Sequence, residues 1–112
     1  MLKTWGQHVR GDVFTLKAPR GASGSEQQGN RFALVLQSDD LSLSTWLVAP
    51  TSTSTTPTSF RPEIELLGRT TRVQVEQTTA VDPARLGEWV ARVTLAEMQD
   101  VEAALRSVLG LD

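Results

Sequence analysis

The clearest hydrophobic pattern in the chain lies near its C-terminal end, where apolar residues recur at the spacing of one helical face. Thr94 and Glu97 precede this stripe as a T-x-x-E capping box, and Gly110 follows it as a C-cap residue. The pattern predicts a helix over residues 95–109. The stripe that we expect to be buried consists of Leu95, Met98, Val101, Leu105, Val108 and Leu109.

Shorter apolar runs in the rest of the chain predict strands. Alternating apolar positions predict a first strand over residues 9–17, and RFALVLQS at residues 31–38 predicts a central strand. Gly68 marks a turn between two later strands. Several short strands before one terminal helix indicate an α+β fold, built on a small, strongly bent antiparallel sheet or barrel. The remaining predicted strands cover residues 45–49, 60–66, 72–76 and 89–93.

Three segments lack these patterns. Residues 18–30 contain three glycines and a proline, which predicts a long irregular loop. Residues 51–59, TSTSTTPTS, contain eight Ser or Thr in nine positions with Pro57 among them, which excludes a buried strand. Asp82 and Pro83 are typical of an N-cap and a first helical residue, so a short helical turn is expected there, ending near Gly87.

Composition narrows the function classes. The 112 residues, 39% apolar and 21% charged, predict one globular domain over residues 1–112. A net charge of −2 excludes a strongly basic, histone-like nucleic-acid binder. The charge is uneven: residues 1–31 hold five basic and two acidic side chains, and residues 32–112 hold six and eleven. We therefore expect an anion-binding surface to draw on the N-terminal third.

Several chemistries are excluded by missing residue types. The chain has no cysteine, which excludes disulfides, thiol catalysis and cysteine-based zinc sites and suits a reducing cytoplasm. The single histidine, His8, excludes a nuclease with paired histidines in one subunit. The spacing of His, Asp and Glu indicates no metal site, so we expect neither metal nor cofactor. No leader or membrane-spanning run is found, and we expect a cytoplasmic protein without membrane contact.

Five motifs in collinear order resemble those of the MazF, PemK and Kid family, the endoribonuclease toxins of bacterial toxin–antitoxin pairs. They are RGDVF at 10–14, GSEQQGNRFALVLQS at 24–38, LVAPTS at 47–52, VEQ at 75–77 and DVEAALRSVLGL at 100–111. The resemblance implies an SH3-like small β-barrel of the CcdB/PemK type with a C-terminal helix, acting as a homodimer. It also implies a cognate, MazE-like antitoxin whose disordered tail lies along the toxin.

The family resemblance further implies metal-independent, sequence-specific cleavage of single-stranded RNA. In that reaction a 2′-hydroxyl attacks its own phosphate and leaves a 2′,3′-cyclic phosphate and a 5′-hydroxyl. Arg31 then binds the phosphate in bidentate fashion and Ser52 donates its hydroxyl to it, with Thr51 as the alternative if the alignment slips by one residue. Glu76 accepts the 2′ proton or holds the ribose, and Gln77 hydrogen-bonds a base edge.

Glu26 and Gln27 lie in the glycine-rich loop, which borders the active site in the family. The resemblance therefore implies that both residues shape RNA binding and share the acid–base work with Glu76. The chain departs from the family at three positions. Phe32 replaces a usual proline, and Gln74 and Thr79 stand where many relatives carry arginine.

Two other functions remain open on the sequence alone. One is a CcdB-like binding toxin that poisons a target enzyme on the same scaffold. The other is a degenerate toxin that binds antitoxin but no longer cleaves, which the losses at Gln74 and Thr79 would explain. RNA cleavage discriminates the endoribonuclease from both.

Overall fold

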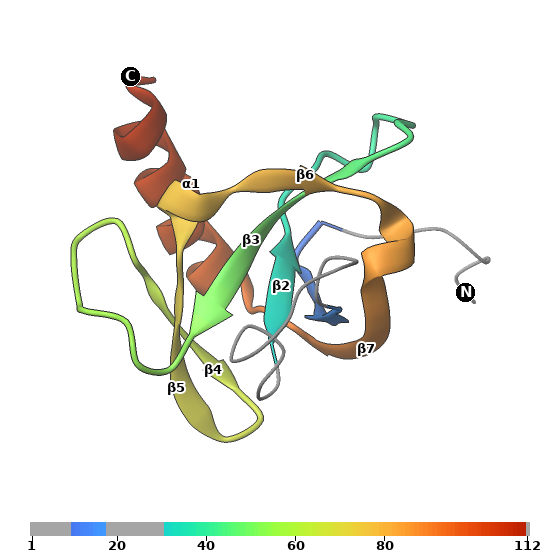
Figure 1. Ribbon diagram of the computed structural model, residues 1–112. Helices are drawn as coiled ribbons and strands as arrows, with labels where there is room; N and C mark the ends of the chain where they lie inside the picture. The colour runs from blue at the N-terminus through green and yellow to red at the C-terminus, as the bar shows by residue number, and fades with distance from the viewer. Residues whose placement is uncertain (1–9, 18–30, 112) are drawn as a thin grey trace.

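The computed structural model describes residues 10–17 and 31–111 (Figure 1). Its elements are short strands, two 3-10 helices and a C-terminal α-helix. In chain order they are β1 (Asp12–Leu16), β2 (Phe32–Val35), β3 (Trp46–Ser52), β4 (Glu63–Leu66), β5 (Arg69–Val73), η2 (Val75–Gln77), β6 (Thr79–Val81), η3 (Pro83–Arg85), β7 (Leu86–Arg92) and α1 (Leu95–Leu109).

The strands form one curved sheet in the order β4-β5-β3-β2-β1-β7, and β6 pairs with β3 beside this path. Neighbouring strands are antiparallel throughout the pairs that the structure describes. The β4–β5 hairpin projects from one end of the sheet (Figure 1), and α1 packs against the sheet, where Glu97 accepts a hydrogen bond of 2.8 Å from Glu65 N of β4. The expected mainly β, α+β architecture with a C-terminal helix is therefore confirmed.

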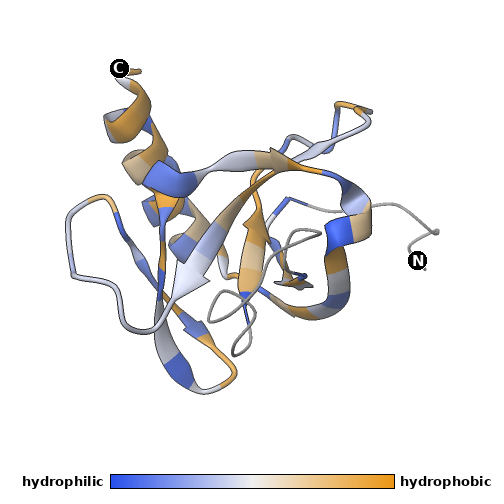
Figure 2. Ribbon diagram, in the orientation of Figure 1, coloured by the Kyte–Doolittle hydropathy of each residue, from blue (hydrophilic) through white to orange (hydrophobic). Residues whose placement is uncertain are grey.

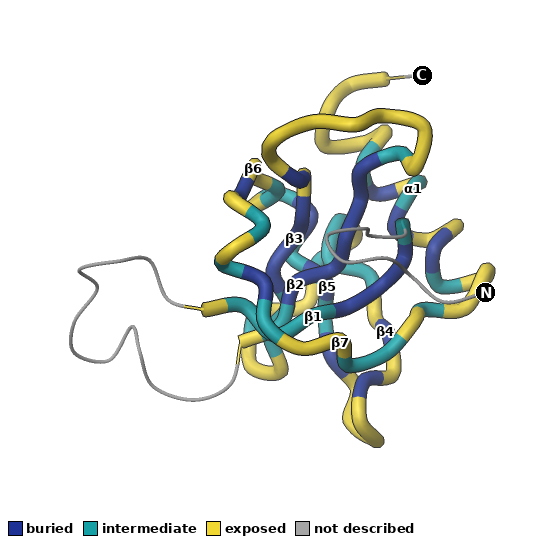
Figure 3. The backbone as a smooth tube through the Cα atoms, turned by 90° about the vertical axis from the view of Figure 1, so that its right-hand side faces the viewer, coloured by how far each residue is buried: buried dark blue, intermediate teal, exposed yellow. Residues whose placement is uncertain are grey.

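The predicted central strand is central in the sheet and buried on both faces. Leu34 joins the core cluster that contains Met98 and Val101 of α1, whereas Ala33 and Val35 join a second cluster around Trp46. Neighbouring residues of a strand point to opposite faces, so β2 contributes alternately to the two clusters. Figure 2 shows β2 as an apolar strand, and Figure 3 shows the middle of the sheet as the most buried part of the chain.

β3 changes partner at Pro50. Its first part pairs with β6 and its end pairs with β5, both on the same edge. The carbonyl of Pro50 accepts a hydrogen bond of 2.8 Å from Gln74 N on that edge, but proline has no N–H to continue the ladder. The 3-10 helix η2 lies at this interruption and carries Glu76 and Gln77.

Helix α1 has the predicted limits and caps. Thr94 and Glu97 form the capping box, and Gly110 adopts a left-handed conformation with φ of 69°. The predicted buried stripe is only partly right. Met98 and Val101 are buried and Leu105 is half-buried, but three of its members are exposed, because the sheet covers less of the helix than the apolar stripe spans. The exposed members are Leu95, Val108 and Leu109.

Three other predictions need correction. Strand β3 continues through Thr51 and Ser52, although a loop was expected to begin at residue 51. β5 ends at Val73, and residues 75–77 form η2 instead of the end of a strand. Strand β6 was not predicted. The turn at Gly68 and the short helical turn after Asp82 are confirmed, and Asp82 caps the latter by accepting a hydrogen bond of 2.8 Å from Ala84 N.

Of the helices in the described part of the chain, none is long and apolar enough to cross a membrane.

Candidate nucleic-acid interface

The end of β3 brings Arg31 and Ser52 together. In the β2–β3 ladder, Ala33 pairs with Pro50 and Leu34 with Ala49. Continuing this register by two residues places Arg31 directly opposite Ser52. Directly opposite residues of an antiparallel pair have side chains on the same face. Arg31 is exposed, and its carbonyl accepts a hydrogen bond of 2.8 Å from Leu16 N, which fixes its backbone against β1.

The hydroxyl of Ser52 is held by the loop that follows it. Its Oγ accepts hydrogen bonds of 3.1 Å from the backbone N–H groups of Ser54 and Thr55. These two bonds use the oxygen lone pairs, so the hydroxyl proton is directed to the Oγ of Ser54, 3.5 Å away, a long contact that an anion can replace. The arrangement suits a residue that donates to an anion.

Thr51 differs from its neighbour in its hydrogen bonding. Its Oγ1 donates to the backbone carbonyl of Phe32 over 3.4 Å, which commits its proton within the sheet. Thr51 is thus less suited than Ser52 to donate to a ligand.

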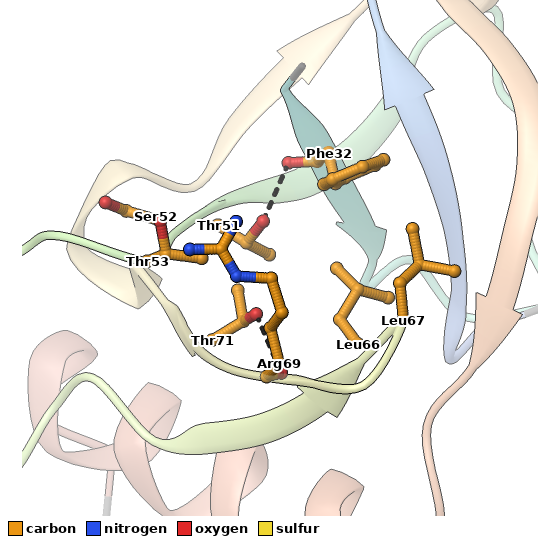
Figure 4. Close-up of a pocket in the computed structure, with 8 residues that line it drawn as sticks. All are labelled: Phe32, Thr51, Ser52, Thr53, Leu66, Leu67, Arg69 and Thr71. Carbon is orange, nitrogen blue, oxygen red and sulfur yellow. Dashed lines mark hydrogen bonds between the residues drawn. The ribbon is translucent and has the colours of Figure 1, made fainter. Parts of the chain in front are cut away.

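A pocket of about 260 Å³ opens beside the end of β3 (Figure 4). Its wall combines apolar side chains, threonine hydroxyls and one arginine. Figure 4 shows the Arg69 side chain rising from the β4–β5 hairpin, with its guanidinium directed toward Thr51 and Thr53. The lining residues are Phe32, Thr51, Ser52, Thr53, Leu66, Leu67, Arg69 and Thr71.

Glu76 is bound by Arg61. The Nε and Nη2 atoms of Arg61 donate to Oε2 of Glu76 over 2.9 and 2.7 Å, and both side chains are about one-fifth exposed, at 19% and 21%. Nη1 of Arg61 donates to the carbonyl of Thr56 over 2.8 Å. The pair therefore ties η2 to the Ser/Thr-rich loop that follows β3.

This ion pair sets the protonation of Glu76. Burial of the carboxyl raises its pKa, but the Arg61 hydrogen bonds, a backbone hydrogen bond and the Arg61 charge outweigh burial and bring the pKa of Glu76 below its ordinary value of 4.5. Its other oxygen, Oε1, is buried and has no hydrogen-bond partner among the described residues. Glu76 is consequently ionised at neutral pH, with one oxygen already engaged.

The predicted site residues therefore fall into three groups. Arg31 and Ser52 lie on one face at the end of β3 by the β2–β3 register, with Thr51 on the other face, whereas Glu76 on η2 is bound to Arg61. Gln77 is exposed beside Glu76 on η2. Glu26 and Gln27 lie outside the described residues. Searching the two described ranges shows no group of three or more His, Cys, Asp or Glu side chains that could hold a metal ion.

Two arginines of this region were not predicted, Arg61 and Arg69. The Arg61 contact joins residues fifteen positions apart, and nothing in the local sequence indicates it. No local signal indicates Arg69 itself, although the turn before it reads Leu67-Gly68 where a tight hairpin favours Asn-Gly. An apolar residue at such a position indicates a requirement other than folding.

Comparison with known proteins identifies the scaffold. A family model described as the PemK-like, MazF-like toxin of type II toxin–antitoxin systems matches residues 9–109. The chain belongs to this family. A Mycobacterium tuberculosis protein named as a candidate toxin is 36% identical over 104 residues, which cover 92% of this chain and 98% of that protein.

Solved structures show the same PemK/MazF-like fold. An endoribonuclease from a mycobacterial species superposes with a TM-score of 0.78 at 17% identity, over 97% of each chain. A chain of the MazE–MazF complex of Deinococcus radiodurans superposes with a TM-score of 0.73 at 25% identity, over 94% of this chain and 97% of that one. The expected barrel-like fold of this toxin family is confirmed.

Proposed function

We propose that this PemK/MazF-like toxin is a metal-independent, sequence-specific endoribonuclease that cleaves single-stranded RNA. The observation that carries the proposal is the pairing of Arg31 with Ser52 at the end of β3, on the fold of a toxin family. A permanent guanidinium and a serine hydroxyl are the two donors that bind the scissile phosphate in this proposal. The similarity to an endoribonuclease of a mycobacterial species supports the same activity.

Arg31 and Ser52 stabilise the pentacovalent phosphate. During the reaction the 2′ oxygen forms a bond to phosphorus, the bond from phosphorus to the 5′ oxygen breaks, and charge grows on the nonbridging oxygens. Arg31 binds both nonbridging oxygens through its planar fork, and Ser52 donates to one of them. Neither donor has to rearrange, because the Ser52 oxygen is already held by Ser54 and Thr55.

Glu76 takes the 2′ proton or holds the ribose. Its carboxylate is ionised at neutral pH, and Oε1 is the oxygen that Arg61 does not bind; because Oε1 is buried, the side chain has to turn outward to meet the substrate. Gln77 hydrogen-bonds a base edge from the same 3-10 helix. Glu26 and Gln27, in the loop before Arg31, are proposed to contact RNA and to share the acid–base work. A proton must also reach the leaving 5′ oxygen, and water or one of these side chains delivers it.

The toxin acts in the cytoplasm as a homodimer and is inhibited by a MazE-like antitoxin tail that covers Arg31. The MazE–MazF complex of Deinococcus radiodurans, which contains a chain of the same fold, supports this partner. A tail with acidic side chains would complement the Arg31 side chain, which is exposed.

Cleavage of a defined transcript by the purified, antitoxin-free protein tests the activity. We expect a 5′-hydroxyl and a 2′,3′-cyclic phosphate at each cut. Full cleavage is expected in EDTA, and none where the cut position carries a deoxyribose. Arg31→Ala is expected to lower cleavage about a hundred- to a thousandfold, on the scale of losing a donor to a developing oxyanion.

Arg106→Ala is the matched control, because Arg106 is an exposed arginine on α1 away from β3. It should cleave like the wild type, and both variants should keep the wild-type circular dichroism and melting temperature. Retained cleavage by a folded Arg31→Ala protein would refute the site. Absence of cleavage by the wild type would favour a CcdB-like binding toxin or a toxin that only binds antitoxin.

A further inference from the structure

We propose that the tip of the β4–β5 hairpin is a second RNA subsite, in which Arg69 binds a phosphate flanking the scissile one and Leu67 contacts the neighbouring base. The proposal rests on the endoribonuclease function above and adds to it a substrate-positioning element from a strand pair that the sequence motifs do not include. It makes substrate affinity and sequence preference depend on a surface separate from Arg31.

Arg69 is the available cation of the pocket. Its guanidinium has no hydrogen bond or ion pair with any side chain in the described part of the protein, whereas Arg61 and Arg72 are each bound to a glutamate. Among the described residues, its hydrogen bonds are those of its backbone, which pairs with Leu66 in the hairpin and whose carbonyl accepts a hydrogen bond of 3.2 Å from Thr71 Oγ1. Figure 4 shows the guanidinium at the mouth of the pocket, where a phosphate can approach it from solvent.

Arg31 and Arg69 approach the end of β3 from different faces. Arg31 shares the face of Ser52 by the β2–β3 register. Thr51 pairs with Val73 of β5, and Arg69 lies four residues before Val73, so it shares the Thr51 face of the sheet. A single strand of RNA that crosses the end of β3 would therefore meet one guanidinium on each side, at different phosphates.

Leu67 adds an apolar surface at a cost to folding. It is 67% exposed and is the non-glycine residue with a positive φ, of 54°, in the described chain. With Gly68 at φ of 79° it forms the two-residue turn of the hairpin. A leucine in the left-handed region is strained, and its exposure means that packing does not compensate for this. Figure 2 shows the tip as an apolar spot between polar strand segments.

The size and the lining of the pocket suit a single nucleotide. Leu66, Leu67 and Phe32 supply apolar contacts for the face of a base, and the hydroxyl of Thr53 is available for a base edge or a ribose. The volume of about 260 Å³ is below the ~300–1,000 Å³ of pockets for drug-sized ligands. One base with its phosphate on Arg69 suits this size and composition.

The test measures binding of a fluorescent RNA that carries a deoxyribose at the mapped cut position, so that it binds without being cleaved. We expect Arg69→Ala to weaken its affinity about tenfold. The slope of log affinity against log salt should fall by roughly 0.7, the value for one phosphate contact with a single strand. Arg69→Lys should restore the slope but only part of the affinity, because lysine binds phosphate as a point charge.

Leu67→Asn separates the base contact from the phosphate contact. It should weaken binding several-fold without changing the salt slope, while its melting temperature rises because asparagine tolerates the left-handed conformation. With cleavable RNA, both tip variants should raise KM and leave kcat within about twofold of the wild type. Arg106→Ala is again the control and should match the wild type in both assays.

The outcomes distinguish the subsite from the activity. If the wild type cleaves and Arg69→Ala binds with unchanged affinity and unchanged salt slope, the subsite is refuted and the endoribonuclease stands. If Arg69→Ala loses kcat as Arg31→Ala does, with KM unchanged, Arg69 belongs to the reaction centre and the flanking role is wrong. If the wild type cleaves no RNA, the function and the subsite fail together.

Discussion

The loop that follows β3 and the tip of the β4–β5 hairpin contrast in an unexpected way. The loop, residues 53–62, is rich in Ser and Thr and has no regular structure, yet Ser52 and Arg61 bind its backbone and Gln74 donates to the hydroxyl of Thr55. The tip belongs to a regular hairpin, yet it carries a strained Leu67 and an unpaired Arg69. The irregular loop after β3 is thus the segment held by side-chain hydrogen bonds, and the regular β4–β5 hairpin carries the side chains that are available to bind a ligand.

Arg61→Ala should have the largest effect on stability, because it removes the side chain that holds the loop after β3. It leaves the Glu76 carboxylate mostly buried and unpaired, so we expect a loss of about 2 kcal/mol in the free energy of unfolding. This is below the ~3–5 kcal/mol of a fully buried pair, because both partners keep some exposure. Urea denaturation measures the loss.

Adding Glu76→Gln to Arg61→Ala should cost less than the sum of the single losses, since the uncompensated charge is gone. Additive losses would show that the pair does not hold the loop. Arg106→Ala, on an exposed face of α1, should leave the unfolding free energy within about 0.5 kcal/mol of the wild type.

Ser52→Ala should loosen the start of the same loop. The N–H groups of Ser54 and Thr55 lose their shared acceptor, so we expect a loss of about 1 kcal/mol in stability, typical of a missing side-chain cap. Limited proteolysis should then cut within residues 53–62 faster than in the wild type. Ser54→Ala, which keeps the Ser52 oxygen in place, should not accelerate the cut.

Leu67→Asn should stabilise the tip by about 0.5–1 kcal/mol, the scale of relief from an unfavourable left-handed residue. Thermal denaturation measures the gain. Leu67→Ala is the matched control, because alanine also has a Cβ and keeps the strain, and it should give no such gain. A destabilised Leu67→Asn protein would mean that the exposed leucine supports the hairpin after all.

The smallest effect should be a difference in acid sensitivity. Because the pKa of Glu76 is lowered in the folded state, its contribution is complete above the ordinary value of 4.5 and is lost as the pH falls through the lower folded value. Wild type should therefore lose more stability between pH 6 and about 3 than Glu76→Gln does. Equal acid dependence of the two melting curves would contradict the ion pair.

The sequence predicted the elements whose signals are local. The capping box at Thr94 and Glu97, the glycine after α1 and the doubly buried run of β2 each depend on residues close together. The predicted element bounds are wrong where tertiary contacts determine the local backbone structure. Residues 75–77 alternate like a strand but curl into η2, because Pro50 gives the ladder no donor at that point.

The sequence predicted the residues of the candidate site that lie in the family motifs, but not the contacts that those residues make. Arg31 and Ser52 were named from the family motifs, and only the observed β2–β3 register sets them opposite each other, because the predicted strand ended at residue 49. The engagement of Glu76 by Arg61 depends on how the loop folds back, so the sequence named the carboxylate without its partner. Arg69 has no motif, and it was found only when the hairpin placed it beside Thr51.

The missing donor at Pro50 also divides the edge of β3 into two independent halves. On one side of the gap, β6 sets its own register, and on the other side β5 sets a different one. Insertions or deletions within η2 can therefore change how far its acidic and amide side chains reach without shifting either strand. Changes of length at η2 would therefore let relatives recognise different RNA sequences while the strands of the barrel keep their pairing.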